Sequence, residues 1–457
     1  MNTQFNHLSR RDFLRLAAAS AAASMLTACG VSATPQAPSN SPVQLVYQDW
    51  RTDWFPAMAQ EQLAKFNSEH PDIRVFYTPD PDNKVEKMVA DMAAGTAPDL
   101  MSGCCDFFPE WADAGQLLDL RPYVAQDLDE ATINEWSPAQ YKALFTRDGV
   151  QFGLPQYHGS LALYYNKDMF DEAGVAYPTD EWTHDEYLQA MTSLTVRNTD
   201  TSTRWGGMFD VSWDRIQIHV NGWGGNYVDP EDPTRCVMSF PKALGAMEWL
   251  RARMWDDHVM ASFLDVQNKE TRKAFIDQHI AMVEDGSWAL KDILENTEFR
   301  VGIATFPAGP ERKVTLGTTD GFGIFARTRY PDQAWEFLKF LVSQDYGRAM
   351  ARTHFLQPAR SSLLPEWIEF IRKEYPERTQ DVNIAAFTDG QIKGYSVTAE
   401  IFPKMVGVGK LTEDIWDQIF TLGKEPVTSM INVCRTIEGM QKDQAGLPTD
   451  CLCGPEG

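Results

Sequence analysis

The chain has 457 residues, of which 43% are hydrophobic and 23% are charged, and its formal net charge at pH 7 is −23. This composition is typical of a globular protein and excludes a collagen-like or wholly disordered chain. The length is enough for two or three folded units. Because a strongly negative protein repels a polyanion, we expect no nucleic-acid partner.

The first thirty residues carry the pattern of an export signal. Arg10 and Arg11, with Phe13 and Leu14 close behind, precede an apolar run over 16–28. A charged start, a short apolar run and small residues at its end are typical of secretion signals, and this run is too short to span a bilayer stably. The paired arginines resemble those of the twin-arginine export signal.

Cys29 predicts a lipid anchor. It follows Leu26-Thr27-Ala28, an order that resembles the bacterial lipobox, in which the cysteine becomes the lipidated first residue of the mature protein. Residues 30–42 are small, polar and proline-containing, so they cannot offset their ordering entropy by burial and are expected to form a tether. We therefore predict a signal at 1–28, a lipidated tether at 29–42, and a body held outside the cytoplasmic membrane, in the periplasm or at the cell surface.

Six cysteines remain once Cys29 is set aside, and an oxidising location permits a disulfide. Six cysteines allow fifteen pairings, among which the sequence does not choose. The closest pairs in sequence are too short to bridge without strain. The histidines show no cluster with metal-ligand spacing, so we expect structural thiols or one disulfide, no metal and no cofactor. The six are Cys104, Cys105, Cys236, Cys434, Cys451 and Cys453.

Strand and helix patterns alternate from residue 43 onward. In chain order they are a strand at 43–47, a helix at 55–66, a strand at 73–77, a helix at 85–92 and a strand at 99–102. Asp53 is placed to cap the first helix, and Gly95 to end the second. Alternation at this spacing predicts an α/β fold with a parallel, doubly wound sheet.

The middle of the chain continues the alternation, and the last hundred residues read as mostly helical. The expected later elements are strands at 161–165, 205–209, 280–283 and 321–326 and helices at 215–220 and 334–341. In doubly wound sheets the ligand lies beyond the carboxyl ends of the strands. Asp49, Trp50 and Arg51 follow the first strand, and Asp106 follows the third.

Several motifs recur along the chain in a fixed order. They are Ala97-Pro98-Asp99-Leu100, the segment 114–120, Gly153-Leu154-Pro155, the segments 163–167 and 173–175, Ala281-Met282 followed by Gly286-Ser287-Trp288, and the segments 321–326 and 334–338. Their order and spacing resemble those of family 1 extracellular solute-binding proteins, the maltose-binding-protein-like sugar-binding lipoproteins of ABC importers. The resemblance covers essentially the whole mature chain.

The resemblance implies a type II periplasmic-binding-protein-like fold, with two α/β lobes joined by a hinge of three crossings. It places the crossings near 153–158, 300–306 and 343–348. The first lobe would then combine 43–154 with 301–343, and the second 155–300 with 344–457. It also implies a monomer that is not an enzyme, and that delivers its solute to the transmembrane subunits of an ABC permease.

A sugar presents apolar C–H faces and a rim of hydroxyls, so its site needs flat aromatic rings and paired polar groups. The candidate platforms are Trp50, Trp213, Trp223 and Trp288, the last at the family's Gly-Ser-Trp position. The candidate polar contacts are Asp49, Arg51, Asp106, Asp285 and Asp320, with Tyr157 and His158 just after the first crossing. Cys104 and Cys105 depart from the small polar residues expected in the loop that holds Asp106.

Other functions stay open at this level. The abundant acid would also suit a binder of polyamines, and a polyol phosphate is a further alternative. A lipid-anchored glycosidase would need two carboxylates across a scissile bond, and no motif singles out such a pair. The sequence contains no nucleophile elbow, Walker loop, Rossmann glycine fingerprint or HExxH motif.

Overall fold

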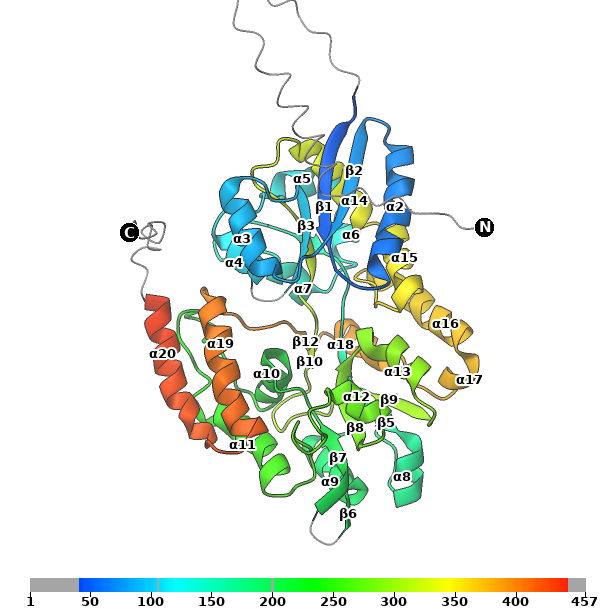
Figure 1. Cartoon of the computed structure of the whole chain (residues 1–457), viewed down its shortest axis with the longest axis vertical. Coiled ribbons are helices and arrows are strands. Elements are labelled where there is room, and N and C mark those ends of the chain that lie inside the picture. The colour runs from blue at the N-terminus through cyan, green and yellow to red at the C-terminus, as the bar shows by residue number, and fades with distance from the viewer. Residues whose placement is uncertain (1–40, 105–106, 199–200, 443–457) are drawn as a thin grey trace, which may run out of the picture. The chain divides into compact units, whose positions relative to one another are not determined.

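The computed structural model describes residues 41–104, 107–198 and 201–442. The chain divides into two units, Met1–Pro42 and Val43–Gly457, and the description below concerns the second (Figure 1). The predicted export signal, Cys29 and almost all of the predicted tether lie outside the described residues, and so does Asp106.

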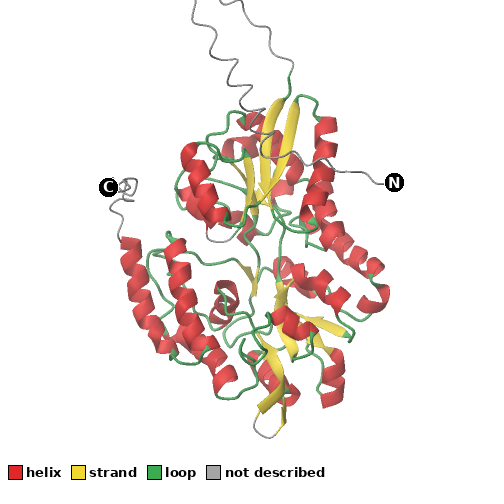
Figure 2. Ribbon diagram, viewed as in Figure 1, coloured by secondary structure: helices red, strands yellow, loops and turns green. Residues whose placement is uncertain are grey.

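Two five-stranded sheets organise the second unit, and helices flank both (Figure 2). The first sheet has the order β2-β1-β3-β11-β4. Its strands are β1 (Val43–Asp49), β2 (Ile73–Pro79), β3 (Leu100–Gly103), β4 (Leu154–Pro155) and β11 (Gly321–Ile324). β1 pairs in parallel with β2 and β3, as the alternation predicted, whereas β11 runs antiparallel between β3 and β4.

The helices of the first sheet bury the apolar stripes seen in the sequence. Each contributes to the sheet's core: α2 (Phe55–Glu69), α3 (Lys84–Ala94) and α14 (Pro331–Leu341). The predicted cap of α2 was wrong, because Trp54 occupies the N-cap position and the Thr52 hydroxyl accepts a hydrogen bond from the Phe55 amide at 3.1 Å. Gly95 ends α3 as expected, with φ of 75° in the left-handed region that glycine tolerates.

The second sheet has the order β6-β7-β8-β5-β9. Its strands are β5 (Leu161–Asn166), β6 (Val196–Asn198), β7 (Thr201–Met208), β8 (Ile280–Gly286) and β9 (Val301–Ala304). β7 and β8 are parallel, and β5 runs antiparallel to both β8 and β9. Residues 301–304 therefore belong to the second sheet, and the expected passage at 300–306 comes later in the chain. The pattern of one short apolar strand does not tell which sheet receives it.

Two chain segments connect the sheets side by side. Residues 156–160 lead from β4 to β5, and residues 317–320 lead from β10 (Thr315–Leu316) to β11. We call these two segments the hinge ribbon, because Ser160 and Gly317 form an antiparallel bridge. β10 itself pairs in parallel with β12 (Ser396–Val397). We call the first sheet with its helices the first lobe, and the second sheet with its helices the second lobe.

The third passage runs along α15 (Gln344–His354). This helix packs on α2, and its Tyr346 and Met350 belong to the core cluster of the first sheet. Ala351, near its end, belongs to a cluster of the second lobe that also contains Trp367. The start of α15 therefore packs with the first lobe, a few residues beyond the division expected at 343/344.

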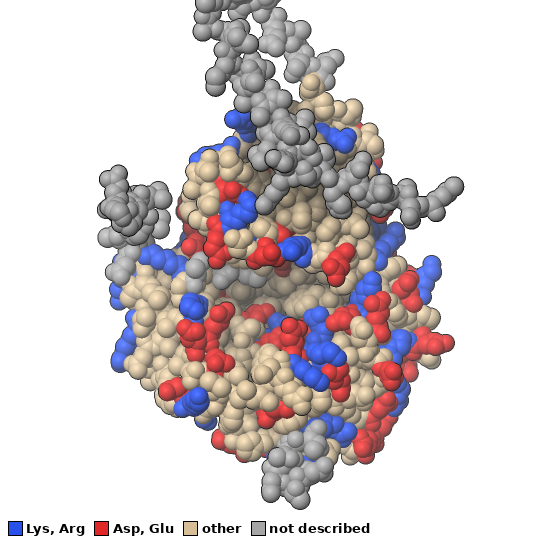
Figure 3. All heavy atoms as spheres, in the orientation of Figure 1, with Lys and Arg blue, Asp and Glu red and all other residues tan. Residues whose placement is uncertain are grey.

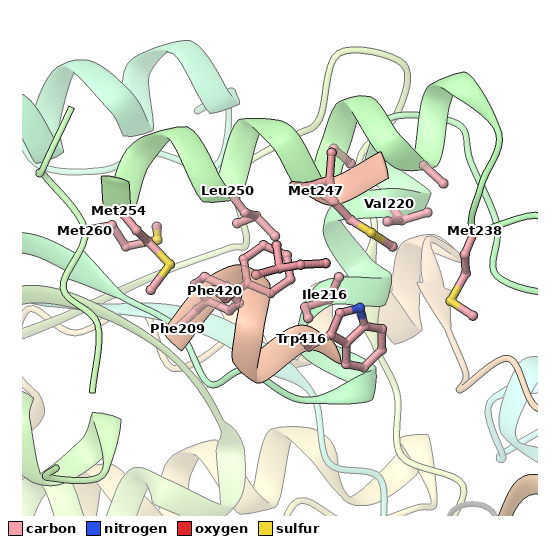
Figure 4. Packing of buried hydrophobic residues seen from close by; sticks show 14 of the residues in the cluster. Phe209, Ile216, Val220, Met238, Met247, Leu250, Met254, Met260, Trp416 and Phe420 are labelled. Carbon is pink, nitrogen blue, oxygen red and sulfur yellow. The ribbon is translucent and has the colours of Figure 1, made fainter. Parts of the chain in front are cut away.

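The largest core cluster fills the second lobe between α10 (Trp213–Gly222), α11 (Pro241–Trp255) and α19 (Met405–Trp416). Figure 4 shows Met247 and Leu250 of α11 facing Phe420 and Ile216, with Trp416 beside them. A disulfide joins Cys236, in the loop before α11, to Cys434 on α20 (Met430–Lys442). The structure thus supplies one bond that the sequence did not choose.

The remaining elements lie between those already described. The remaining α-helices are α4 (Phe107–Asp113), α5 (Arg121–Asp127), α6 (Glu130–Ile133), α7 (Pro138–Ala143), α8 (Lys167–Ala173), α9 (His184–Leu194), α12 (Thr271–Ile276), α13 (Leu290–Asn296), α16 (Leu364–Glu374), α17 (Pro376–Thr379) and α18 (Ala386–Lys393). Short 3₁₀ turns occupy Ser287–Ala289, Ser361–Leu363 and Val427–Ser429, and a π-helical turn occupies Asp417–Thr421. Within the described ranges, none of the helices combines the length and apolar character that a membrane crossing requires.

Candidate functional site

A cavity of about 550 Å³ opens between the two lobes. Its first-lobe wall comes from α4, from α7 and from the loop after α7, with Lys142 and Arg147 among its residues. Its second-lobe wall comes from the segment 396–401, Asn221 and Arg312. Figure 3 shows the surface hollowed between the lobes, with acidic and basic side chains along the rims. The volume lies in the range that ligand pockets occupy.

A second cavity, of about 280 Å³, adjoins the first, since both are lined by Thr319, Ala399 and Ile401. Its walls combine indole rings, a thioether and carboxylates. They include Trp213, Trp416, Met405, Asp214, Asp320 and Glu413. The two cavities form one cleft, which runs past the hinge ribbon and along α19.

Asp320 is the predicted carboxylate that the fold brings to this cleft. It ends the hinge ribbon, lines the second cavity and is only 6% exposed. Burial raises the pKa of its carboxyl to about 7. At neutral pH the group therefore exists in both protonation states, so it can donate or accept a hydrogen bond.

Asp49 ends β1 as predicted, but it lies beneath the surface of the cleft, with 0% exposure. The Trp50 amide donates to its carboxylate at 2.8 Å, and Gln156 Nε2 donates at 3.1 and 3.3 Å. The Tyr47 hydroxyl donates as well. Burial raises the pKa of Asp49 to about 6, while the Ser102 and Tyr47 hydroxyls, the Trp50 amide and the charge of Lys84 oppose the rise.

Trp50 and Arg51 lie near the same strand end. Trp50 is half-buried and packs edge-on against Tyr157 of the hinge ribbon, with 5.2 Å between ring centroids. It also contacts Trp54 at 6.3 Å, so the aromatic rings form a continuous group there. Arg51 is exposed and pairs with Asp82.

Trp288 lies where the core clusters of both lobes meet. It packs against two clusters of the second lobe and the cluster of the first sheet. The Arg215 guanidinium lies over its ring, 5.4 Å from the centroid. A Cβ at Gly159 would come within 2.7 Å of the Trp288 ring, so glycine in the hinge ribbon permits this approach.

Asp285 pairs with two arginines, of which Arg215 is the one that lies over the Trp288 ring. Its carboxylate accepts from Arg272 Nε at 2.8 Å and lies 3.7 Å from Arg215 Nη2. The carboxyl is buried, so its lone pairs are used by these cations. The structure therefore places Asp285 as support for Arg215 and, through it, for Trp288.

The other predicted side chains are distributed across the second lobe and the hinge. Trp213 begins α10 and lines the second cavity, whereas Trp223 ends α10 and donates its indole N–H to His184 at 3.2 Å. Trp223 lines neither of the two cavities described. His158 is buried in the hinge ribbon, and burial lowers the pKa of its imidazole to about 4, so it is neutral at pH 7.

The polar residues of the first cavity that were not among the sequence candidates include Asn221, Arg312 and Glu400. The Glu400 carboxylate accepts from the amides of Tyr227 at 2.6 Å and Val228 at 3.0 Å, and from Asn221 Nδ2 at 2.7 Å. A signal existed for Asn221, since it opens the Gly-rich turn 221–226. Arg312 and Glu400 lie in loops without a motif, and only the fold brings them to the cleft.

The described residues contain no group of three or more His, Cys, Asp or Glu side chains placed to hold a metal ion. Indole faces, hydroxyls, amides, carboxylates and guanidinium groups are the partners that a small polar solute requires.

The family model for the bacterial extracellular solute-binding protein matches residues 48–348. The chain belongs to this family. The resemblance drawn from the motifs is thereby confirmed, and the family's location outside the cytoplasm applies to this chain.

Curated relatives match much of the chain at low identity. A binding protein of Brucella abortus (strain 2308) is 24% identical over 80% of this chain and 85% of its own length. The maltodextrin-binding protein MdxE of Bacillus subtilis is 22% identical over 74% of this chain and 77% of its own length. The maltotriose-binding protein of Pyrococcus abyssi is 23% identical over 63% of this chain and 59% of its own length.

Solved structures show the same fold. The ABC substrate-binding protein Lmo0181 of Listeria monocytogenes, in complex with cycloalternan, has a TM-score of 0.75 at 21% identity and covers 87% of this chain and 99% of its own. The GacH receptor of Streptomyces glaucescens has a TM-score of 0.70 at 19% identity, over 88% of this chain and 99% of its own. The predicted two-lobed type II architecture is confirmed, with the sheets mixed rather than wholly parallel.

Proposed function

We propose that this protein is the substrate-binding lipoprotein of an ABC transporter, and that it captures a mono- or oligosaccharide in the cleft between its lobes. The observation that carries the proposal is the composition of that cleft. Trp213 and Trp416 line it together with Asp320, Glu400 and Arg312, along two adjoining cavities. Relatives that bind maltotriose, arabino-oligosaccharides and maltodextrins support a carbohydrate ligand.

The chemistry of a sugar fits these walls. An indole ring covers the apolar C–H face of a pyranose, and side chains with two polar atoms hold neighbouring hydroxyls. The adjoining cavities have volumes of about 550 and 280 Å³, so the cleft offers an extended site rather than a single small one. We propose Trp213 and Asp320 as contacts of the first rank, with Asn221, Arg312 and Glu400 beside them. Trp288 lines neither cavity, and we propose it as a further aromatic platform beside Gly159 of the hinge ribbon.

For the remaining predicted residues, we propose direct contacts for those that are exposed or half-buried and supporting roles for those that are buried. Trp50 and Tyr157 offer an aromatic edge near the hinge, and Arg51 a donor at the rim. Asp285 supports the indole of Trp288 through Arg215, and Asp106 remains a candidate contact from its loop.

Lobe closure is the proposed mechanism of capture. A solute between the lobes gains contacts from both only when they approach, so its binding shifts the population toward the closed form. The closed form of a monomer would then be the form that the permease's transmembrane subunits recognise. Capture and release require no covalent chemistry, so we propose that the protein is not an enzyme.

We further propose that a twin-arginine signal exports the chain and that Cys29 carries the lipid anchor. Replacing Cys29 with serine removes the only group that the lipobox can modify. The variant should be released from membranes, whereas the unaltered chain should sediment with them. Mass spectrometry of the N-terminal peptide checks the modification itself, and an unmodified Cys29 in the membrane fraction would contradict it.

The proposed ligand class is tested by calorimetry against a panel of defined solutes. Maltotriose, maltotetraose and an arabino-oligosaccharide represent the sugars, spermidine represents the polyamines, and sorbitol phosphate represents the polyol phosphates. A ligand that binds only the folded form at about 100 times its Kd stabilises it by about 2.7 kcal/mol, which a melting curve also detects. Binding of spermidine or sorbitol phosphate alone would overturn the carbohydrate proposal.

The glycosidase alternative has its own test. The same oligosaccharides are incubated with the protein for a day, and new reducing ends are measured. If the unaltered protein releases reducing sugar and a cleft variant such as Asp320→Asn does not, the protein is a catalyst. We expect no such release.

A further inference from the structure

The two segments of the hinge ribbon are held together by backbone hydrogen bonds. The Gln156 amide donates to the Asp320 carbonyl at 3.0 Å, and the Thr318 amide donates to the Gly159 carbonyl at 2.9 Å. The Gly159 amide also donates to Thr318 Oγ1 at 2.9 Å. The two passages therefore move as one ribbon, and any rotation between the lobes has to bend it.

One buried side chain fastens this ribbon to the first lobe. Gln156 reaches the carboxylate of Asp49 with its side-chain amide, at 3.1 and 3.3 Å. Asp49 ends β1, and it stands in no ion pair with a lysine or arginine among the described residues. The other atom of the Gln156 amide, Oε1, has no hydrogen-bond partner, so the contact with Asp49 is the bond that orients this side chain.

The third passage reaches the same carboxylate through two tyrosines. The Tyr47 hydroxyl donates to Asp49, and it lies 3.4 Å from the hydroxyl of Tyr346 on α15. α15 is the helix along which the chain leaves the first lobe. All three passages between the lobes are thus connected to Asp49: the first directly through Gln156, the second through the bond between Gln156 and Asp320, and the third through Tyr47 and Tyr346.

Hydrogen bonds and the nearby charge of Lys84 stabilise the ionised carboxylate of Asp49. Lys84 on α3 directs its ammonium group to Asp80 at 2.6 Å and to the Ser102 carbonyl at 3.1 Å. Asp80 and Asp320 add negative charge nearby, and the remaining titratable neighbours are the hydroxyls of Tyr47, Tyr77 and Tyr346. A charge held by donors from the ribbon and from β1 couples the carboxylate to the position of the ribbon.

We propose that Asp49 is a positioning residue that fixes the angle at which the hinge ribbon leaves the first lobe, and thereby sets how readily the lobes close. The inference rests on the proposed capture by lobe closure. The ionised carboxylate accepts from Gln156 and Tyr47 together. Once neutral, it accepts more weakly, and the ribbon loses its fixed attachment.

Scattering without any sugar tests the proposal. Small-angle X-ray scattering of the purified protein is recorded from pH 8 to pH 5, for the unaltered chain, Asp49→Asn and Gln156→Met. In the unaltered chain we expect the radius of gyration to change with a midpoint near pH 6, because burial raises the pKa of Asp49 to about that value. Both variants should match the unaltered protein at pH 5 and show no such transition.

Asp320→Asn is the matched control, since Asp320 is a second buried carboxyl near the ribbon. It should keep the transition near pH 6, because Asp49 and Gln156 are intact. If this control abolishes the transition, or if Asp49→Asn keeps it, the assignment to Asp49 fails. The proposal is also overturned if the radius of gyration of the unaltered protein stays constant from pH 8 to pH 5.

Hydrogen exchange supplies a second measurement at a single pH, where intrinsic rates are equal. At pH 7.5 the ribbon amides of Gln156 and Thr318 should exchange about tenfold faster in Gln156→Met than in the unaltered protein. This variant leaves Asp49 in place, so it also serves if Asp49→Asn does not fold. Equal exchange rates would contradict the proposal. Because no ligand is present, a failure of sugar binding leaves both measurements interpretable.

Discussion

The indole N–H of Trp213 donates a hydrogen bond to the carbonyl oxygen of Glu400 at 2.8 Å, across 187 positions of sequence. Trp213 lines the smaller cavity and Glu400 the larger one. This bond fastens the segment 396–401 to the start of α10, and the Glu400 carboxylate fastens the same segment to the amides of Tyr227 and Val228. The second-lobe wall of the cleft is therefore one connected structure.

The first prediction concerns Glu400. In Glu400→Gln, the remaining oxygen can still accept from the amides of Tyr227 and Val228, which both donate to one carboxylate oxygen. The new NH₂ then faces the Nδ2 donor of Asn221, so that bond is lost and a donor is left unpaired. We expect a loss of about 1–3 kcal/mol in the free energy of unfolding, measured by urea denaturation. We also expect weaker binding of the best sugar of the panel. Trp213→Phe is the control that removes a single indole donor, and it should cost less stability.

The second prediction concerns Trp288. Replacing it with alanine removes a proposed platform and also packing against three core clusters. We expect most of the sugar affinity to be lost in calorimetry and about 2–4 kcal/mol of stability to be lost, since large-to-small changes leave a cavity. Trp288→Phe keeps an aromatic face and should recover part of both. Unchanged sugar binding in the alanine variant would reject Trp288 as a contact.

The third prediction is a pH dependence that Asp320 causes. Its folded pKa of about 7 lies well above its ordinary value of 3.8. The folded form therefore holds the proton more tightly, so this group's contribution to stability is fully present below pH 4 and is lost as the pH rises through 7. At pH 8 the buried charge costs at most about 4 kcal/mol.

Asp320→Asn removes that cost, so the variant should be much more stable than the unaltered chain at pH 8 and more stable by a smaller margin at pH 5, where only the unfolded carboxyl is ionised. Thermal unfolding followed at both values decides this. A variant that is destabilised equally at pH 5 and pH 8 would contradict the prediction, because it would show that the Asp320 carboxyl is ionised and hydrogen-bonded at both pH values.

The fourth prediction concerns the disulfide between Cys236 and Cys434, which closes a segment with a sequence separation of 198. A cross-link over so long a loop restricts the unfolded chain, and removal of such bonds costs about 2–5 kcal/mol. The double variant Cys236→Ser, Cys434→Ser should lose stability in that range, by urea denaturation under oxidising conditions. Adding reductant should destabilise the unaltered protein and leave the double variant unchanged. If reductant does not move the urea midpoint of the unaltered protein, the disulfide contributes nothing to its stability.

The sequence by itself determined the strand–helix alternation that builds the first sheet, and several strands and helices of the second lobe. The apolar stripe of α3, its stop at Gly95 and the parallel pairing of β1, β2 and β3 follow from local periodicity and from the short distances between these elements. The ordered motifs determined the family as well, because they combine turns and strand ends whose spacing a different fold would not keep.

Only the tertiary structure decided which side chains share the cleft. Asp49 ends β1, and Asp320 directly precedes β11, which runs antiparallel to β3, so both lie at the same edge of the first sheet. Yet Asp49 is fully buried behind Gln156, while Asp320 lines a cavity. Arg312 and Glu400 carry no local pattern at all. Which side chains are buried, which groups they bond to and which sheet β9 joins all depend on contacts between residues far apart in the chain. The periodicity of a sequence reflects only residues that are close together in it.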